Sequence, residues 1–331
     1  MSKKFTVLLV EKIDEAGMSI LNKVAEVKFA SSHSEKVLAE EVREVDALII
    51  RVMGKVSKKV IKNARKLKVI GHHGAGLDNI DLQAATERGI PVVYTPDANT
   101  ESVADHTIGL MIAVAKKIPQ AHYALTRDKN WSIRYECIGT EIYKKTLGLI
   151  GLGRIGRSVA RRAKGFKMRV LAYDPYISED VTKKLGVKLV DLKTLLSNSD
   201  FVSIHVPSTK ETHKMIGKRE LEIMKSKAFL INTSRGGVVD EVAVYKALIK
   251  GKLAGAAFDV YEKEPPDPNN PLFKLDNVVA TPHMAAHTEE ALRSMAITVA
   301  RDTVKVLKGK RPKYVATPKY LNDFPVVMLF L

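Results

Sequence analysis

The stretch Leu-Gly-Leu-Ile-Gly-Leu-Gly-Arg-Ile-Gly, residues 147–156, decides the fold of this chain. It begins as a short apolar strand and continues as the glycine pattern G-x-G-x-x-G, which leads into a helix predicted over 157–167. In such a strand–turn–helix unit the first glycine permits a tight turn and the second lets the backbone approach a pyrophosphate. The third glycine lets the helix pack closely on the strand, and the helix N-terminus then faces the anion. The stretch therefore predicts a dinucleotide-binding site.

The next predicted strand supports this interpretation and indicates which dinucleotide binds. It covers 169–173 and is followed directly by Asp174, where a carboxylate is expected to accept hydrogen bonds from the adenosine ribose. Asp174-Pro175-Tyr176 offers no arginine that would pair with a 2′-phosphate, so the sequence favours NAD over NADP. The alternative, in which Asp174 only caps a turn, is left open by the sequence.

Short apolar runs and helical stretches alternate along the rest of the chain. The runs predict strands at 5–10, 47–50, 69–70, 92–94, 146–150, 169–173, 201–205, 228–232, 256–260 and 278–281. Helices are predicted between them, among others at 14–24, 34–43, 57–65 and 80–88. Near-continuous apolar strands separated by helices are typical of parallel sheets covered on both faces, so we expect an α/β fold. Two longer helices, near 101–117 and 289–307, adjoin changes of strand set and are candidate connectors between domains.

Length and composition limit the class of protein. The 331 residues are enough for roughly two domains of about 150 residues each. A hydrophobic content of 45% excludes a wholly disordered chain, and the single cysteine, Cys137, cannot form an intrachain disulfide. No apolar run has the form of a signal peptide or approaches the roughly 20 residues of a membrane span. We therefore expect a cytoplasmic protein without a membrane partner; the role of the short apolar end at 326–331 is left open.

The chain is strongly basic, with 54 Lys and Arg against 37 Asp and Glu and a net charge of +17. The basic residues are scattered as pairs along the whole chain, and aromatic residues make up only 6%. This pattern lacks the basic tract with interleaved aromatics that is typical of a nucleic-acid interface, so we expect no nucleic-acid partner. The positive charge instead favours the attraction of a small anionic substrate and an anionic cofactor.

Three polar residues follow predicted strands of the second half and have the chemistry that carbonyl reduction requires. Arg235 can hold a carboxylate in a two-pronged contact. His283 can give and take the proton, and Glu264 can fix its tautomer and favour the imidazolium form. Spacing alone leaves structural alternatives open. An arginine after a strand is often the partner in a surface ion pair, and Glu-Pro often only ends a segment.

Four sequence motifs, in this order, resemble those of the D-isomer-specific 2-hydroxyacid dehydrogenases over nearly the whole chain. They are the glycine loop, Asn-Thr-Ser-Arg-Gly-Gly-Val-Val-Asp at 232–240, Phe-Asp-Val-Tyr-x-x-Glu-Pro-Pro at 258–266 and Thr-Pro-His at 281–283. By this resemblance Arg235 is the substrate-binding arginine, Glu264 orients the histidine, and His283 is the general acid and base.

The resemblance also implies an architecture of two Rossmann-like, doubly wound domains. A flavodoxin-like substrate domain is expected from residues 1–98 plus 289–331, with a Rossmann NAD-binding domain at 99–288 inserted into it. Proteins of this family are usually homodimers or homotetramers, with their nucleotide domains in contact, and we expect the same here.

Further site residues follow from the resemblance. Cofactor contacts are expected at Ala75, Gly151, Gly153, Arg154, Ile155, Gly156, Asp174, His205, Val206, Pro207, Thr212, Thr233, Ser234, Asp259 and Ala286. Substrate contacts are expected at Arg51, His72, Gly74, Ala75 and Gly76. Amide groups of residues 74–76 can bind a carboxylate, and Arg51 adds charge for a phosphate. No metal is expected, because the adjacent His72 and His73 diverge.

The sequence does not single out one substrate among those of the family. Arg51 favours a phosphorylated hydroxy acid, 3-phosphoglycerate, whereas His72 stands where an arginine is more usual and favours hydroxypyruvate, glyoxylate or another anion such as sulfolactate. His287, after the catalytic histidine, is a second departure from the family pattern. A protein of another class, a nucleotide-sensing corepressor with this fold, would bind NADH without turnover, and no feature of the sequence requires it.

Overall fold

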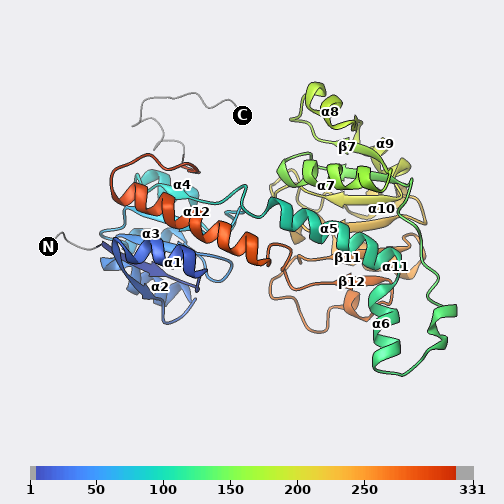
Figure 1. Ribbon diagram of the computed structural model, residues 1–331, viewed down its shortest axis with the longest axis horizontal. Coiled ribbons are helices and arrows are strands. Elements are labelled where there is room, and N and C mark those ends of the chain that lie inside the picture. The colour runs from blue at the N-terminus through green and yellow to red at the C-terminus, as the bar shows by residue number, and fades with distance from the viewer. Residues whose placement is uncertain (1–4, 318–331) are drawn as a thin grey trace. The chain divides into compact units, whose positions relative to one another are not determined.

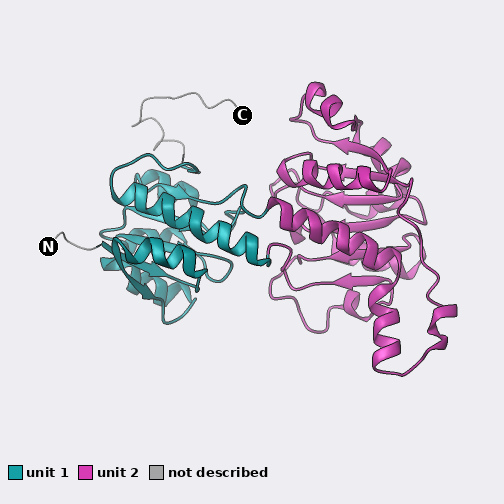
Figure 2. Ribbon diagram, in the orientation of Figure 1, with its two compact units in different colours: residues 1–99, 287–331 teal, residues 100–286 magenta. Residues whose placement is uncertain are grey.

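The computed structural model describes residues 5–317 of the chain (Figure 1). It divides into two compact units, which we call unit 1, residues 1–99 with 287–331, and unit 2, residues 100–286 (Figure 2). The boundaries expected from the sequence, at 98/99 and 288/289, lie beside these. The apolar end at 326–331 is outside the described residues.

Unit 1 contains a five-stranded parallel sheet in the order β2-β1-β3-β4-β5, the order typical of flavodoxin-like folds. Its strands are β1 (Phe5–Leu9), β2 (Ala25–Phe29), β3 (Ala47–Ile50), β4 (Val69–His72) and β5 (Val92–Val93). Its helices are α1 (Glu15–Asn22), α2 (Glu35–Glu41), α3 (Lys58–Asn63), α4 (Leu82–Glu87) and α12 (Glu289–Leu307), with the short 3-10 helix η1 (Val42–Glu44). One core cluster lies between the sheet and α2, α3 and α4, and a second lies between the sheet and α1 and α12.

Unit 2 contains a seven-stranded sheet in the order β12-β11-β10-β9-β6-β7-β8, also parallel throughout. Its strands are β6 (Thr146–Ile150), β7 (Arg169–Tyr173), β8 (Lys188–Leu189), β9 (Phe201–Ile204), β10 (Phe229–Asn232), β11 (Gly255–Phe258) and β12 (Val278–Ala280). The direction of winding reverses between β6 and β9, and in open parallel sheets ligands bind beside the carboxyl ends of strands at such a switch point.

Helices cover both faces of the second sheet. They are α5 (Thr100–Ala115), α6 (Ile118–Thr126), α7 (Arg154–Gly165), α8 (Glu179–Leu185), α9 (Leu192–Asn198), α10 (Lys218–Ile223) and α11 (Glu241–Ile249), with the 3-10 helices η2 (Ser132–Tyr135), η3 (Gly236–Val238) and η4 (Pro271–Lys274). The apolar side chains of α5 and α7 form one core cluster with the strands, and those of α9, α10 and α11 form the other. The expected α/β fold with two doubly wound sheets is therefore confirmed.

Most predicted strands match the observed ones, but β2 and β8 lie outside the predicted strands. In β2 only Ala25 is buried, because the strand lies at the edge of its sheet and turns most of its side chains to solvent. An edge strand of this kind lacks the apolar run by which central parallel strands are recognised. Within residues 5–317, no helix has the length and apolarity needed to cross a membrane.

Candidate active site

The glycine loop lies at the switch point, between the carboxyl end of β6 and the start of α7. Gly151 has φ of +92°, and a side chain there would approach the carbonyl oxygen of His205 to 2.7 Å. A side chain on Gly156 would overlap the carbonyl oxygen of Gly151, so only glycine closes this turn. At Gly153, by contrast, an added Cβ would meet no atom within 4 Å. The open space at this central glycine is what a pyrophosphate approaching the backbone requires.

The residues around the loop fit a dinucleotide. Helix α7 has Gly153 as its N-cap, which carries no side chain to accept from the first amide groups of the helix. Those amides, together with the helix dipole, favour an anion. Asp174 follows β7, and its carboxylate accepts hydrogen bonds from the backbone N–H of Leu152 at 2.8 Å and of Tyr176 at 2.9 Å. Asp174 thus lies against the glycine loop, where a ribose carboxylate contact is expected.

The segment after β9 lies beside the same loop. The carbonyl of His205 and the side chain of Val206 are the groups that a side chain on Gly151 would meet. Nε2 of His205 is 2.9 Å from the hydroxyl of Ser203, and burial lowers the pKa of His205 to about 3, which keeps its imidazole neutral. The hydroxyl of Thr212 donates to the carbonyl of Pro207 at 2.6 Å and closes this loop.

Arg235 follows β10, and the backbone around it is organised by Asn232, which is fully buried at the end of that strand. The Asn232 amide donates to the carbonyl of Arg235 at 2.9 Å, and its oxygen accepts from both the N–H and the hydroxyl of Ser234. The guanidinium of Arg235 donates from Nη1 to the carbonyl of Ser234 at 2.7 Å. Thr233, also predicted as a cofactor contact, is buried, and its hydroxyl lies 2.8 Å from that of Thr107.

His283 and Glu264 form a direct pair, with Nδ1 of the imidazole 2.6 Å from Oε2 of the carboxylate. The other oxygen of Glu264 accepts from the N–H of Tyr261 at 3.1 Å, which fixes the carboxylate. The hydrogen bond to Glu264 raises the pKa of His283 above its ordinary value, although burial and the nearby charge of Arg235 oppose this. Because the carboxylate of Glu264 accepts a hydrogen bond from Nδ1, this nitrogen carries a proton, and Nε2 of the ring points away from the carboxylate.

The geometry of His283 itself is unusual, because its backbone lies in the left-handed region with φ of +50°. Its N–H donates to the carbonyl of Asp259 at 2.8 Å. The carboxylate of Asp259, which is fully buried, accepts from the N–H groups of Met284 and Ala285, both at 2.8 Å. Ala286 ends unit 2 directly after this loop. The predicted cofactor contacts of Asp259 and Ala286 stay predictions.

The backbone beside Arg235 leads to a stability prediction. A side chain on Gly236 would overlap the backbone of Tyr261 and Glu262, whereas one on Gly237 would meet its nearest atom, Oγ of Ser208, at 3.4 Å. We expect Gly236→Ala to lower the free energy of unfolding by about 3 kcal/mol, the upper range for overpacking, and to disturb both segments. Gly237→Ala is the matched control and should stay within about 0.5 kcal/mol of wild type. Thermal unfolding of the two variants measures this, and equal stabilities would contradict it.

The predicted substrate residues of unit 1 lie at the carboxyl ends of two neighbouring strands. Arg51 follows β3 and His72 ends β4, and the two strands pair so that Ile50 lies opposite His72. Arg51 donates from Nη1 to the carbonyl of Lys12 at 2.9 Å, and its own carbonyl accepts from Asn79 at 3.0 Å. Gly74, Ala75 and Gly76 follow in the loop after β4. A side chain on Gly74 would contact Cε1 of the His72 ring at 2.7 Å, so the loop passes directly over that ring.

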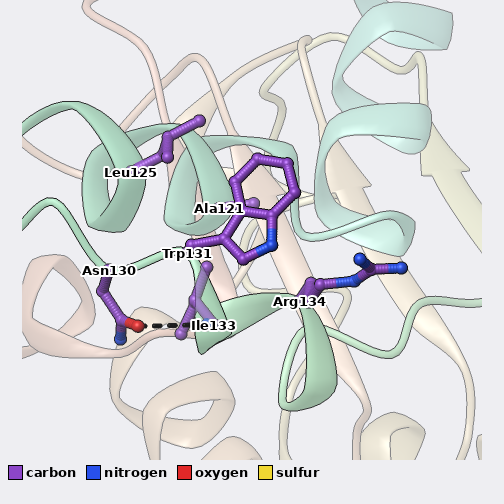
Figure 3. Close-up of a pocket in the computed structure, with 6 residues that line it drawn as sticks. All are labelled: Ala121, Leu125, Asn130, Trp131, Ile133 and Arg134. Atoms are coloured by element: carbon purple, nitrogen blue, oxygen red, sulfur yellow. Dashed lines mark hydrogen bonds between the residues drawn. The ribbon is translucent and has the colours of Figure 1, made fainter.

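A pocket of about 340 Å³ lies elsewhere in unit 2, between α6 and η2 (Figure 3). It is lined by Ala121, Leu125, Asn130, Trp131, Ile133 and Arg134, none of which is a predicted site residue. Within residues 5–317, no group of three His, Cys, Asp or Glu side chains has an arrangement that would hold a metal ion.

Comparison with known proteins agrees with this geometry. Residues 108–285 match the NAD binding domain of D-isomer specific 2-hydroxyacid dehydrogenases. The chain is 47% identical to D-3-phosphoglycerate dehydrogenase of Archaeoglobus fulgidus over 98% of its own length and 62% of that protein's. It is 43% identical to glyoxylate reductase of Korarchaeum cryptofilum over 92% and 94% of the two lengths. The apo-structure of D-lactate dehydrogenase from Escherichia coli superposes with a TM-score of 0.82 at 34% identity, covering 94% of this chain and 99% of that one.

Fold and site together define a two-unit α/β protein with an NAD-binding unit. The chain belongs to the D-isomer specific 2-hydroxyacid dehydrogenase family. It spans about three fifths of the length of the D-3-phosphoglycerate dehydrogenases with which it shares 47% identity, 62% of one and 58% of another.

Proposed function

We propose that this protein is an NAD-dependent D-2-hydroxyacid dehydrogenase that oxidises D-3-phosphoglycerate to 3-phosphohydroxypyruvate, a step that supplies serine biosynthesis. The observation that carries the proposal is the His283–Glu264 pair, 2.6 Å apart, in the same unit as the glycine loop and Arg235. The glycine loop and Asp174 would hold NAD, which would supply the hydride acceptor for C2 of the hydroxy acid.

The chain's own residues handle the proton and the charge. During oxidation Nε2 of His283 takes the proton of the C2 hydroxyl, and during reduction the imidazolium returns it to the carbonyl oxygen. Glu264 holds the ring through Nδ1 and raises the pKa of His283, so that the protonated form persists to higher pH. Arg235 binds the substrate carboxylate through two parallel N–H contacts and polarises the neighbouring carbonyl.

The relatives support this substrate but also favour a second candidate. D-3-phosphoglycerate dehydrogenases from two archaea are 47% identical to the chain, and Arg51 supplies a cation for a phosphate. A reductase of hydroxypyruvate or glyoxylate is the alternative, because a glyoxylate reductase at 43% identity matches over nearly its full length. His72 in place of an arginine favours the same alternative, which also includes dehydrogenases of other anionic hydroxy acids such as sulfolactate.

The deciding experiment follows NADH oxidation with 3-phosphohydroxypyruvate, hydroxypyruvate and glyoxylate in parallel. A clear preference in kcat/KM for the phosphorylated substrate supports the proposal. Preference for the other two assigns the hydroxypyruvate or glyoxylate reductase, and no oxidation of NADH or NADPH with any of the three refutes both of these substrate assignments.

The remaining assignments belong to the same proposal. Unit 1 acts as the substrate domain and unit 2 as the NAD-binding domain, in a cytoplasmic homodimer or homotetramer. Exposed apolar side chains in the segment after α6 support contact between copies, since Trp131, Tyr135 and Ile138 are 68%, 72% and 77% exposed. Sedimentation of the purified protein tests the oligomeric state, and a monomer would contradict it.

Cofactor choice gives a separate prediction at Asp174. Because its carboxylate lies against the glycine loop, Asp174→Ala should weaken NAD binding by about tenfold, the loss expected for a charged hydrogen bond, and relax the preference against NADP. Asp191→Ala is the matched control, since this carboxylate caps α9 on the surface. Titration of both cofactors measures the ratio of affinities, and an unchanged ratio would remove Asp174 from the ribose contact.

A further inference from the structure

Helix α5 opens unit 2 and packs against β10, β11 and β12, whose carboxyl ends lead into the site. Three of its polar side chains reach segments that carry site residues. The hydroxyl of Ser102 donates to the carbonyl of Ala285 at 2.7 Å, and the hydroxyl of Thr107 lies 2.8 Å from that of Thr233. Between them, Nε2 of His106 is 3.0 Å from the hydroxyl oxygen of Thr281. The mechanism above assigns no role to these three side chains.

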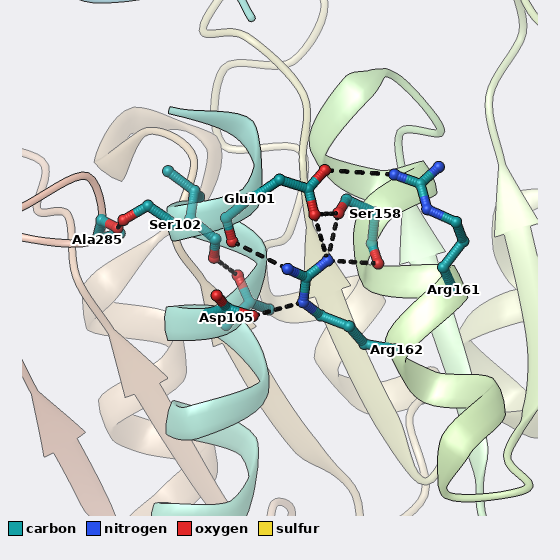
Figure 4. A network of polar contacts seen from close by, with 9 residues as sticks. Glu101, Ser102, Asp105, Ser158, Arg161, Arg162 and Ala285 are labelled. Carbon is teal, nitrogen blue, oxygen red and sulfur yellow. Dashed lines mark hydrogen bonds and ion pairs between the residues drawn. The ribbon is translucent and has the colours of Figure 1, made fainter. Parts of the chain in front are cut away.

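The helix is also fixed from a second direction, by α7 (Figure 4). Arg162 of α7 donates from Nη1 to Glu101 at 2.8 Å and from Nε to Asp105 at 2.6 Å. Ser158 donates to the same carboxylate of Glu101 at 2.8 Å. Since α7 begins at the glycine loop, these contacts anchor α5 to the helix that follows that loop. His106 therefore extends from a fixed support rather than from a free helix.

His106 reaches the catalytic loop through Asp259 and Thr281. Thr281 donates its hydroxyl hydrogen to Oδ1 of Asp259 at 2.6 Å, which leaves its oxygen to accept from Nε2–H of His106. The same imidazole nitrogen is 3.5 Å from Oδ1 of Asp259. Burial raises the pKa of Asp259, but hydrogen bonds from His106, Thr281 and two backbone amides outweigh it and keep the pKa below its ordinary value. A charged, buried carboxylate is thus held by donors on both sides.

The loop that Asp259 holds carries His283, whose backbone lies in the left-handed region. His283 has φ of +50°, a conformation that a non-glycine residue keeps only where its surroundings enforce it. Here the enforcement comes from Asp259, whose carbonyl accepts from His283 and whose carboxylate accepts from Met284 and Ala285. Any displacement of Asp259 or Thr281 is therefore passed to His283 and to its 2.6 Å contact with Glu264.

From this geometry we propose that His106 is a positioning residue for His283, holding the 281–285 loop through Thr281 and Asp259 so that the imidazole stays aligned with Glu264. The proposal rests on the proposed function, in which His283 moves the proton. The charged groups that act on His283 are Glu264 and Asp259, which favour the imidazolium, and Arg235, which opposes it.

The test compares His106→Leu, which removes the hydrogen bond, with His106→Gln, whose amide nitrogen reaches the same distance. His33→Leu is the matched control, because His33 is an exposed histidine of unit 1. We expect His106→Leu to lower kcat about thirtyfold, within the range for a misplaced catalytic group, with NADH affinity within about twofold of wild type. His106→Gln should recover most of kcat, and His33→Leu should match wild type.

A second readout does not depend on turnover. The NMR signal of the His283 ring, assigned by its loss in His283→Ala, reports its pKa in the free protein. Loosening the Glu264 contact removes the main cause that raises the pKa of His283. In the His106→Leu variant the His283 ring should therefore titrate at lower pH than in wild type, and in His106→Gln it should titrate as in wild type. The pH at which reduction loses half its rate should move in the same direction. If His106→Leu does not fold, His106→Asn, whose amide is too short to reach Thr281, replaces it.

The two readouts separate the failure of this proposal from failure of the proposed function. Wild-type kcat and wild-type titration of His283 in His106→Leu would overturn the positioning role. Equal losses in the Leu and Gln variants would overturn it as well, because a hydrogen bond would then not be what matters. If the wild-type protein reduces no 2-oxo acid, the proposed function fails, while the titration of His283 still shows whether His106 positions it.

Discussion

Replacing His283 by alanine is expected to lower kcat for reduction of the 2-oxo acid by about a thousandfold, within the range for loss of general acid catalysis. NADH binding should stay within about twofold of wild type, because the glycine loop and Asp174 are built from other segments of unit 2. Steady-state kinetics measures the first effect and fluorescence titration with NADH the second. Turnover near that of wild type would remove His283 from the acid–base role.

The pH profile sharpens this prediction through Glu264. In the proposed mechanism reduction requires the imidazolium of His283, so the rate of reduction should fall as the pH rises through the raised pKa of this residue. In Glu264→Gln the main cause of the raised pKa is lost, and the alkaline limb should therefore move to lower pH. The control is Glu262→Gln, which lies two positions away and pairs with Lys214 instead. An alkaline limb that stays in place in Glu264→Gln would contradict the assignment.

The glycine loop and its neighbouring strands were predictable because their signals are local. The strand before Gly151, the apolar face of α7 and Asp174 after β7 all lie within one short stretch, and each has a direct physical requirement. The proposed catalytic residues stand out in the sequence only as members of ordered motifs. Each follows a strand of a parallel sheet, but spacing alone does not distinguish such a residue from a surface ion pair.

The supporting polar contacts were not predictable in the same way. His106 and Thr281 are separated by 175 positions, and packing of α5 against the sheet brings them together. Asn232 stands in a quoted motif, yet its role in ordering the Arg235 backbone appears only in the hydrogen bonds. A weak signal for the first was present, since Ser102 and His106 are four positions apart and therefore lie on the same face of helix α5.

Arg235→Lys is the second substitution with a large expected effect, although it keeps the charge. A planar guanidinium can bind both oxygens of a carboxylate, and here Nη1 is already held by the carbonyl of Ser234 at 2.7 Å, which fixes its plane. A lysine ammonium is a point charge on a flexible stem and cannot reproduce this fixed two-pronged contact. We expect kcat/KM to fall about a hundredfold, since the loss affects both binding of the carboxylate and polarisation of the carbonyl.

The comparison that isolates this effect is Arg219→Lys, at an exposed position of α10 in the same unit. Both variants keep the net charge of +17, so attraction of the anionic substrate by the protein as a whole is unchanged. If charge alone mattered at Arg235, the two lysine variants would show the same kcat/KM, and the two-pronged contact would be refuted. If geometry matters, only Arg235→Lys loses activity, and the loss should persist at high salt, where long-range attraction is screened in both variants alike.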